Sequence, residues 1–484
     1  MNYKMMGRFI GLLLMVESIF MMPALIISLC MKEQSSIIGF TITIVILWGI
    51  GILLRLLCRK AKKSFFAKEG LVCVGIGWLI MSLLGCLPFF LSKAIPNYVD
   101  ALFEMVSGFT TTGASILEQV EGLPYGILYW RSFSHWLGGM GVLVFLLAIP
   151  MSGEGGSGFT MHLLRAESPG PNVGKLVPKM KQTAQILYIL YIGLTIVNVI
   201  FLLIGGMPLF DAVCTAFGTA GTGGFGIKGD SMAGYSPYIQ NVCTVFMLLF
   251  GVNFSCYYLL LLKQIKNVLK DEELRIYLGV ILVSILLIVW NLRGFYDTLE
   301  ETVRHAAFQV ASIITTTGYA TTDFDLWPGF SKAILLFLMI IGACAGSTGG
   351  GFKCGRALLV LKNLRRSVRQ LIRPQRVQVV RMNGQAVDEK VLANTNTYVS
   401  AYVIIIIASF LLISVDGFSL MTNFSAVMAC FNNIGPGFEA VGPTSSFASY
   451  SMFSKLVLIW DMLAGRLEIF PILILSSRTT WRQK

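Results

Sequence analysis

Four short segments of the chain combine threonine or asparagine with glycine in a way that suits the binding of a small dehydrated ion. They recur at intervals of roughly 100 residues, and each lies between two long apolar stretches. We call them the signature segments. They are Thr110, Thr111, Thr112 and Gly113; Ala220, Gly221, Thr222 and Gly223; Thr315, Thr316, Thr317 and Gly318; and Asn432, Asn433, Ile434 and Gly435.

A dehydrated monovalent cation needs a ring of oxygen ligands, and backbone carbonyls from four segments can replace its water shell. Glycine lets successive carbonyls turn toward one axis, because it adopts backbone conformations that a side chain resists. No signature segment contains a carboxylate, whereas a ring of Asp or Glu would favour divalent or unselective passage. The alternative is that the segments are tight turns between membrane helices. Four copies in the same context favour an ion pore lined by carbonyls.

The composition is that of a membrane protein with many spans. Hydrophobic residues make up 55% of the chain and charged residues only 13%, against about 25% charged residues in soluble domains. The net charge of +13 does not indicate a nucleic-acid partner, because the basic residues cluster beside apolar spans. The ten cysteines show no CxxC or zinc spacing, so we expect small buried thiols and no disulfide framework.

The signature segments must be positioned by the apolar stretches around them. A half-length stretch precedes each segment, at residues 98–109, 209–217, 298–314 and 420–431. These stretches are too short to cross a bilayer core of about 30 Å, so we expect helices that enter the membrane and turn back. Long helices are predicted on either side, at residues 71–91, 124–149, 184–204, 237–262, 274–290, 331–361, 398–415 and 452–475.

Two further helices, at residues 7–29 and 37–57, precede the repeats. The first is long enough to span a bilayer and no clear cleavage site follows it, so a retained helix is favoured over a signal peptide. The sequence thus predicts an all-α membrane protein with four helix–pore-loop–helix repeats around a pseudo-fourfold pore. The predicted boundaries are 1–66 for the two-helix N-terminal domain, and 67–165, 166–270, 271–385 and 386–484 for the repeats.

Charge predicts the orientation. Residues 353–381 contain nine Lys or Arg and no Asp or Glu, and residues 263–275 and 478–484 are also basic. The loops beside the signature segments are short and carry several carboxylates. By the positive-inside rule, both termini and the basic loops are cytoplasmic, and the segments enter from outside.

Two features of the long helices need separate explanation. Five glycines between Gly342 and Gly351 should break the helix predicted at 331–361. A phosphate-binding loop is excluded because no GxxxxGK[ST] frame fits, which leaves a tight packing site as one interpretation. Arg466 lies deep in the last apolar stretch, where an ion pair with Asp461 or Glu468 is one interpretation. Arg131, His135 and Trp136 are interpreted as helix-packing residues.

The sequence resembles the Trk/Ktr/HKT superfamily of potassium-uptake proteins over essentially its whole length, and most of all its TrkH-type membrane subunits. The motifs that carry the resemblance are SGFTTTGAS (107–115), HWLGGMGV (135–142), GTGGFG (221–226), ITTTGYATTD (314–323), GSTGGGFK (346–353), NNIGPGFE (432–439) and AGRLEIFP (464–471).

The resemblance implies potassium uptake across a bacterial inner (plasma) membrane, with potassium as the transported ion and no organic cofactor. Each repeat would contribute one filter glycine, here Gly113, Gly223, Gly318 and Gly435, and glycine at the first of these implies a potassium-type filter. Arg466 would face the pore below the filter, beside an intramembrane gating loop. The residues of that loop are Gly346, Ser347, Thr348, Gly349, Gly350 and Gly351.

The resemblance also implies a homodimer that docks a cytosolic TrkA-like nucleotide-binding ring subunit, since the chain itself contains no nucleotide fold. The competing hypothesis is a secondary transporter or membrane enzyme that uses the signature segments as substrate turns. With three histidines and no HExxH or GxGD motif, an intramembrane protease has little support, and we expect no enzyme activity. Passive flux and coupling to protons or sodium both stay open at this point.

Overall fold

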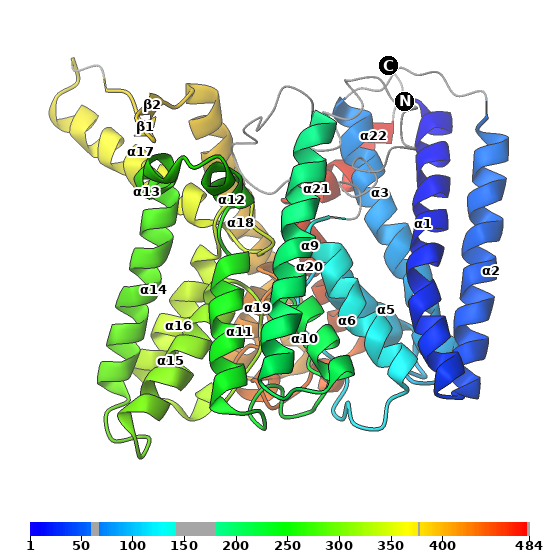
Figure 1. Ribbon diagram of the computed structural model, residues 1–484. Helices are drawn as coiled ribbons and strands as arrows, with labels where there is room; N and C mark the ends of the chain where they lie inside the picture. Colours follow the sequence, from blue (N-terminus) through cyan, green and yellow to red (C-terminus); the bar gives the residue numbers. More distant parts are fainter. Residues whose placement is uncertain (60–66, 142–179, 376–377, 482–484) are drawn as a thin grey trace.

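The computed structural model of the protein describes residues 1–59, 67–141, 180–375 and 378–481. Within these ranges the chain is a bundle of helices, and its strands are limited to a small hairpin of β1 (Arg381–Met382) and β2 (Gln385–Ala386). Figure 1 shows both chain termini at the same end of the bundle as this hairpin. The predicted all-α architecture is confirmed.

The two N-terminal helices lie close to their predicted positions, as α1 (Tyr3–Cys30) and α2 (Gln34–Leu57). They cross at a pair of glycines. A Cβ added to Gly11 would lie 2.8 Å from the Gly51 carbonyl oxygen, and one added to Gly51 would lie 2.9 Å from the Gly11 oxygen. Small residues allow this close backbone approach, which is how helices commonly associate in a membrane.

The four repeats follow in chain order. Their helices are α3 (Ala67–Gly85), α4 (Leu87–Leu91), α5 (Tyr98–Phe109) and α6 (Tyr125–Gly139); α9 (Met180–Ile204), α10 (Leu209–Gly221), α11 (Pro237–Phe250), α12 (Phe254–Leu261) and α13 (Ile265–Lys270); α14 (Glu272–Asn291), α15 (Leu299–Ile314), α16 (Gly329–Ile341) and α17 (Cys354–Ile372); and α18 (Glu389–Ile413), α19 (Leu420–Phe431), α20 (Met452–Arg466), α21 (Phe470–Ser476) and α22 (Arg478–Trp481). The predicted repeat boundaries stay predictions, and the one at 165/166 lies outside the described residues.

Six helices in the described ranges are long and apolar enough to cross a membrane, or seven if one sharply bent pair is counted as a span. Several of them expose large apolar side chains, such as Ile189 of α9 and Leu282 of α14. Exposed apolar surface of this kind is unfavourable in water but suits contact with lipid. The protein is therefore a multi-pass membrane protein.

The half-length helices α5, α10, α15 and α19 lie among the spans and end inside the bundle (Figure 1). Three of them begin at a side chain that accepts a backbone N–H, namely Asn97, Thr298 and Ser419. Such caps satisfy donors that have no partner within the helix. The bounds of α5 and α19 agree with the sequence prediction, whereas α10 runs four residues further than the predicted 209–217.

The second long helix of each repeat is shorter than predicted or broken. The break at 342–351 is confirmed, since α16 ends at Ile341 and α17 begins at Cys354. The predictions of continuous helices at 237–262 and 452–475 are wrong. Helices α11 and α12 meet at an 88° bend, and α20 and α21 are separated at Glu468 and Ile469, which both have positive φ. In the first repeat, α6 ends at Gly139, and residues 142–149 of the predicted helix lie outside the described residues.

The bend between α11 and α12 has a hydrogen-bonding cause. The backbone groups released there pair with the broken segment of the third repeat: Cys344 N–H donates to the Gly251 carbonyl at 3.1 Å, and Phe254 N–H donates to the Gly346 carbonyl at 3.0 Å. Non-helical backbone survives at membrane depth only where protein satisfies its polar groups. The two breaks therefore support each other.

The ten cysteines all fall in the described ranges and none forms a disulfide. Eight of them are buried, as expected for small apolar side chains, but Cys30 is exposed at the end of α1. From the sequence, residues 153–158 and 168–178 are expected to form a cytoplasmic loop that connects the first two repeats. Both segments lie outside the described residues.

Candidate functional site

The half-length helices all end in the same way, at the signature segments. One backbone N–H in each segment donates to a carbonyl five residues earlier, from Thr112 to Ser107, Gly223 to Gly218, Thr317 to Ser312 and Ile434 to Ala429, at 2.8 to 2.9 Å. The residue before each donor has positive φ: 55° at Thr111, 53° at Thr222, 60° at Thr316 and 55° at Asn433. These left-handed residues turn the chain out of the helix.

This shared geometry corrects the register of the second segment. The residue that follows each donor is Gly113, Gly318 or Gly435 in three repeats, with φ of 81°, 83° and 102°, and in the second repeat it is Gly224, with φ of 76°. The expectation that Gly223 is the equivalent of the other three terminal glycines is therefore wrong. Gly223 occupies the donor position, and Ala220 and Gly221 belong to the last turn of α10.

The four equivalent glycines form a closed ring. A Cβ added to Gly113 would lie 2.1 Å from the Gly223 carbonyl oxygen, and one on Gly224 would lie 1.9 Å from the Thr317 oxygen. Continuing round, a Cβ on Gly318 would lie 2.1 Å from the Ile434 oxygen, and one on Gly435 would lie 2.7 Å from the Thr112 oxygen. Each glycine thus abuts the equivalent carbonyl of the next repeat, and no side chain fits at any of the four positions.

In the first and third signature segments, two threonine side chains of the same segment contact each other beside the ring. Within the first segment the hydroxyl oxygens of Thr110 and Thr112 are 2.8 Å apart, and those of Thr315 and Thr317 are also 2.8 Å apart. The Asn433 side chain of the fourth segment donates to the Thr112 hydroxyl at 3.0 Å. Apart from Gly113 and Gly318, which are partly exposed, the residues of the signature segments are buried, and they are held by local bonds as well as by the helices.

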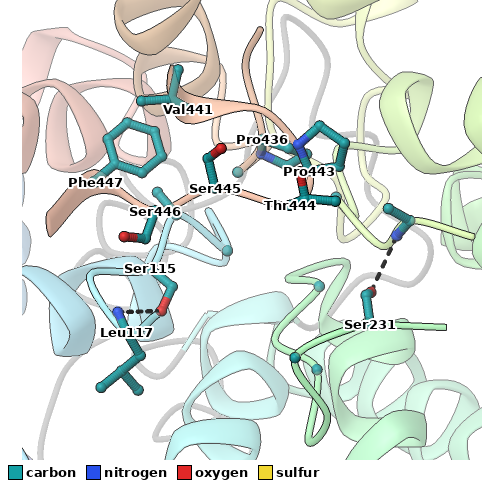
Figure 2. Close-up of a pocket in the computed structure, with 18 of the residues that line it drawn as sticks. Ser115, Leu117, Ser231, Pro436, Val441, Pro443, Thr444, Ser445, Ser446 and Phe447 are labelled. Atoms are coloured by element: carbon teal, nitrogen blue, oxygen red, sulfur yellow. Dashed lines mark hydrogen bonds between the residues drawn. The ribbon is translucent and has the colours of Figure 1, made fainter. Parts of the chain in front are cut away.

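A pocket of about 530 Å³ opens on one side of the ring, and all four ring glycines, Gly224 included, contribute to its wall. Figure 2 shows that Pro436, Pro443, Thr444 and Ser445 lie on one side of this pocket, opposite Ser115 and Ser231. We call it the vestibule. Its wall is mostly polar, and backbone and hydroxyl groups from all four repeats reach it.

A buried ion pair holds two loops of the vestibule in place. Arg131 Nε contacts Glu104 Oε1 at 2.6 Å, and both side chains are almost fully buried. Arg131 also donates to the Gly226 carbonyl at 2.8 Å and to Ser115 Oγ at 3.2 Å. The second Glu104 oxygen accepts the Ile116 N–H at 3.0 Å. The pair therefore links the chain that leaves the first segment to the chain that leaves the second.

The His135 ring links the loop that follows the second signature segment to helix α5. Its Nε2 accepts the Phe225 N–H at 3.2 Å, so its Nδ1 carries the proton and donates to the Gly108 carbonyl at 2.8 Å. The prediction that Arg131 and His135 serve only packing is incomplete, because both hydrogen-bond to the loop of the second segment.

Two carboxylates in the loops on the vestibule side of the protein accept hydrogen bonds from backbone or hydroxyl groups. The Gly229 N–H lowers the pKa of Glu121, and the Ser419 and Thr422 hydroxyls lower the pKa of Glu439. Hydrogen bonds to the charged form are the cause in both cases. Both groups are therefore anionic at neutral pH.

The broken segment of the third repeat lies directly against the other side of the ring. Gly350 N–H donates to Thr316 Oγ1 at 2.7 Å. A Cβ on Gly349 would lie 2.9 Å from the Thr315 carbonyl oxygen, and one on Gly350 would lie 2.8 Å from that of Asn432. We call residues 342–351 the central loop. It packs against the third and fourth signature segments, on the side away from the vestibule.

Arg466 ties the central loop to the first repeat. Its guanidinium donates to the Thr348 carbonyl at 2.9 Å, to the Gly139 carbonyl at 2.8 Å and to the Gly138 carbonyl. Of its two predicted carboxylate partners, Glu468 pairs with Arg356, and Asp461 accepts a bond from Ser409 at 2.7 Å. Arg466 therefore links backbone carbonyls at the end of α6 to a backbone carbonyl within the central loop.

A model of the TrkH family, described as cation transport proteins, matches residues 36–482. The chain belongs to the TrkH family. The TrkH potassium uptake protein of the Trk system in Salmonella typhimurium is 36% identical over the full length of both chains. The TrkG protein of Escherichia coli K12 is 34% identical over 99% of each chain.

A solved structure agrees with the TrkH-family fold. The crystal structure of the potassium transporter TrkH from Vibrio parahaemolyticus superposes with a TM-score of 0.89, at 31% identity and with complete coverage of both chains. Relatives of this TrkH-family chain thus share its length as well as its fold.

Three site residues of this TrkH-family chain escape sequence reasoning. Gly224 was missed because it directly follows Gly223, and the sequence does not show which of the two glycines is equivalent to Gly113. Glu104 was missed because it lies within the otherwise apolar second half of α5, although a carboxylate at that depth signals a buried partner. Lys353 is buried and donates to the Gly349 carbonyl of the central loop.

The buried pair of Glu104 and Arg131 yields a stability prediction. We expect Arg131→Gln to destabilise the protein by about 3–5 kcal/mol, because it leaves a buried carboxylate without its charge partner. The double variant Arg131→Gln/Glu104→Gln should lose less than the single one. The measurement is thermal unfolding of the detergent-solubilised protein.

The control is Glu300→Gln, which removes the exposed i,i+4 pair with Arg304 and should shift the midpoint very little. A single Arg131→Gln variant as stable as the wild type would contradict the role of the pair.

Proposed function

We propose that this TrkH-family protein takes up potassium across a bacterial plasma membrane through the ring of Gly113, Gly224, Gly318 and Gly435. The single observation that carries the proposal is the closed ring, in which each glycine abuts a carbonyl of the next repeat. The relatives named potassium uptake proteins support the choice of ion.

The proposed ion ligands are the backbone carbonyls beside the ring glycines, those of Thr112, Gly223, Thr317 and Ile434. Four carbonyls can replace the water shell of a dehydrated potassium ion. The carbonyl ends of α5, α10, α15 and α19 also point toward the segments, so the negative ends of four helix dipoles favour a cation there. The remaining residues of the signature segments, from Thr110 to Asn433, hold these carbonyls in position.

The central loop is the proposed gate. It lies against the ring on the side opposite the vestibule, where an ion leaving the ring must pass. Its residues Gly346 to Gly351 contact α11 and α12 through backbone bonds, and Arg466 clamps it at Thr348. Arg466 also places a positive charge on the path, which raises the barrier for a cation while the clamp is closed.

The proposed orientation has the vestibule outside and both termini in the cytoplasm. Its support is the excess of Lys and Arg in residues 353–381, at the end of the bundle where the termini lie (Figure 1). We further propose a homodimer that docks a cytosolic TrkA-like nucleotide-binding subunit on its cytoplasmic side. That part rests on the resemblance to the family and on the absence of a nucleotide fold from the sequence.

The filter assignment predicts the effect of a charge in the ring. Gly113→Asp should lower potassium uptake more than about tenfold or abolish the preference for potassium over sodium, because a carboxylate replaces carbonyl coordination and the side chain has no room. Rubidium and sodium uptake in cells that lack other potassium transporters measures both effects.

Gly122→Asp is the matched control. Gly122 lies in the same repeat, also has positive φ, and has no atoms within 4 Å of an added Cβ. Normal potassium uptake and selectivity in Gly113→Asp would sink the filter assignment.

The gate assignment predicts a leak. Arg466→Gln cannot bridge the carbonyls of Gly138, Gly139 and Thr348, so we expect faster rubidium flux into proteoliposomes in the absence of any cytosolic subunit. Arg478→Gln, an equal change of charge at the exposed chain end, should leave the flux unchanged. Equal or slower flux in the Arg466 variant would count against the gate.

A further inference from the structure

Helix α17 carries a basic pocket that neither the ring nor the central loop uses. The pocket has a volume of about 220 Å³. Four of its basic residues are Lys362, Arg365, Arg366 and Arg369, which share one face of α17 at helical spacing. Arg381 of β1 closes the pocket from the hairpin. Five cationic side chains thus surround one small cavity.

The positive charge of this pocket is only partly balanced. Lys362 pairs with Glu272, and Arg366 pairs with Glu389. Across the described ranges, Arg365, Arg369 and Arg381 form no ion pair with a carboxylate. The Nε of Arg366 is buried and, within the same ranges, has no hydrogen-bond partner. An anion in the pocket would satisfy these groups, and arginine favours phosphate because its planar fork donates two parallel bonds.

The position of the pocket along the membrane normal indicates the source of the anion. Its two acidic neighbours, Glu272 and Glu389, are the first residues of α14 and α18, which are both long enough to span a membrane. The pocket therefore lies level with the ends of membrane spans, where lipid headgroups are found.

The face of α17 next to the pocket is apolar and exposed. Its large side chains are Leu361, Leu364, Val368, Leu371 and Ile372, with Leu371 83% exposed. A helix with basic and apolar faces side by side lies in the interface of a membrane, with the apolar face toward the acyl chains. A soluble anion would leave this apolar face uncovered, whereas a phospholipid supplies both the phosphate and the hydrocarbon.

We propose that the pocket binds the headgroup of an anionic phospholipid, with Arg365 and Arg369 as its main phosphate ligands and the apolar face of α17 on the acyl chains. Helix α17 begins at Cys354, directly after the central loop. The bound lipid would therefore contact α17, the helix that follows the central loop. The proposal does not depend on which ion the ring conducts.

The test is a lipid titration of the full-length purified protein in detergent, followed by native mass spectrometry. The probes are phosphatidylglycerol and, as the zwitterionic reference, phosphatidylcholine. We expect tighter binding of phosphatidylglycerol, and binding on the order of thirtyfold weaker in Arg365→Gln/Arg369→Gln, since basic residues near anionic lipid contribute roughly fivefold each. Each single variant should show about a fivefold loss.

The control is Lys266→Gln/Lys270→Gln on α13, which removes two exposed charges outside the pocket and should bind phosphatidylglycerol as the wild type does. Equal losses in the control, or no preference for phosphatidylglycerol, would overturn the proposal. Displacement of the lipid by inorganic phosphate or ATP at similar concentration would assign the pocket to a soluble anion instead. Unchanged lipid binding with an altered oligomeric state would assign the face to a second copy of the chain.

Discussion

The structure depends on one steric constraint, the approach of four backbone segments so close that none of them can carry a Cβ at the contact. Each of Gly113, Gly224, Gly318 and Gly435 abuts a carbonyl of the next repeat. Carbonyl oxygens repel one another, so such a ring needs rigid surroundings to hold it. The half-length helices and the buried pair of Glu104 and Arg131 supply the rigid surroundings.

The same constraint recurs where the long helices meet the half-length helices. A Cβ on Gly138 of α6 would lie 1.9 Å from the Phe109 carbonyl oxygen, and one on Gly465 of α20 would lie 1.9 Å from that of Phe431. These equivalent contacts in the first and fourth repeats bring the second helices against the ends of α5 and α19. Arg466, the last residue of α20, donates to the Gly138 and Gly139 carbonyls at the end of α6 and to Thr348 of the central loop. The backbone groups released at the bend between α11 and α12 bond to the same loop. The ring, the breaks and the loop therefore form one connected unit.

Much of this arrangement can be predicted from the sequence, because the membrane spans and the half-length helices differ in length and the glycines of the signature segments recur. The bounds of α5 and α19 follow from the capping residues Asn97 and Ser419 and from the left-handed turns after them. The register at Gly224 could not be predicted, since either of two adjacent glycines can follow the helix. The bend at Gly251 could not be predicted either, because its cause is the pairing with residues more than ninety positions later, at Cys344 and Gly346.

The most direct test of the central claim is the position of a heavy potassium analogue in the protein. A crystal structure of the protein grown in rubidium, with anomalous diffraction, would locate the ion. The account predicts a rubidium peak on the axis of the ring, coordinated by the carbonyls of Thr112, Gly223, Thr317 and Ile434. A ring without rubidium, or a peak coordinated by side chains elsewhere in the bundle, would contradict it.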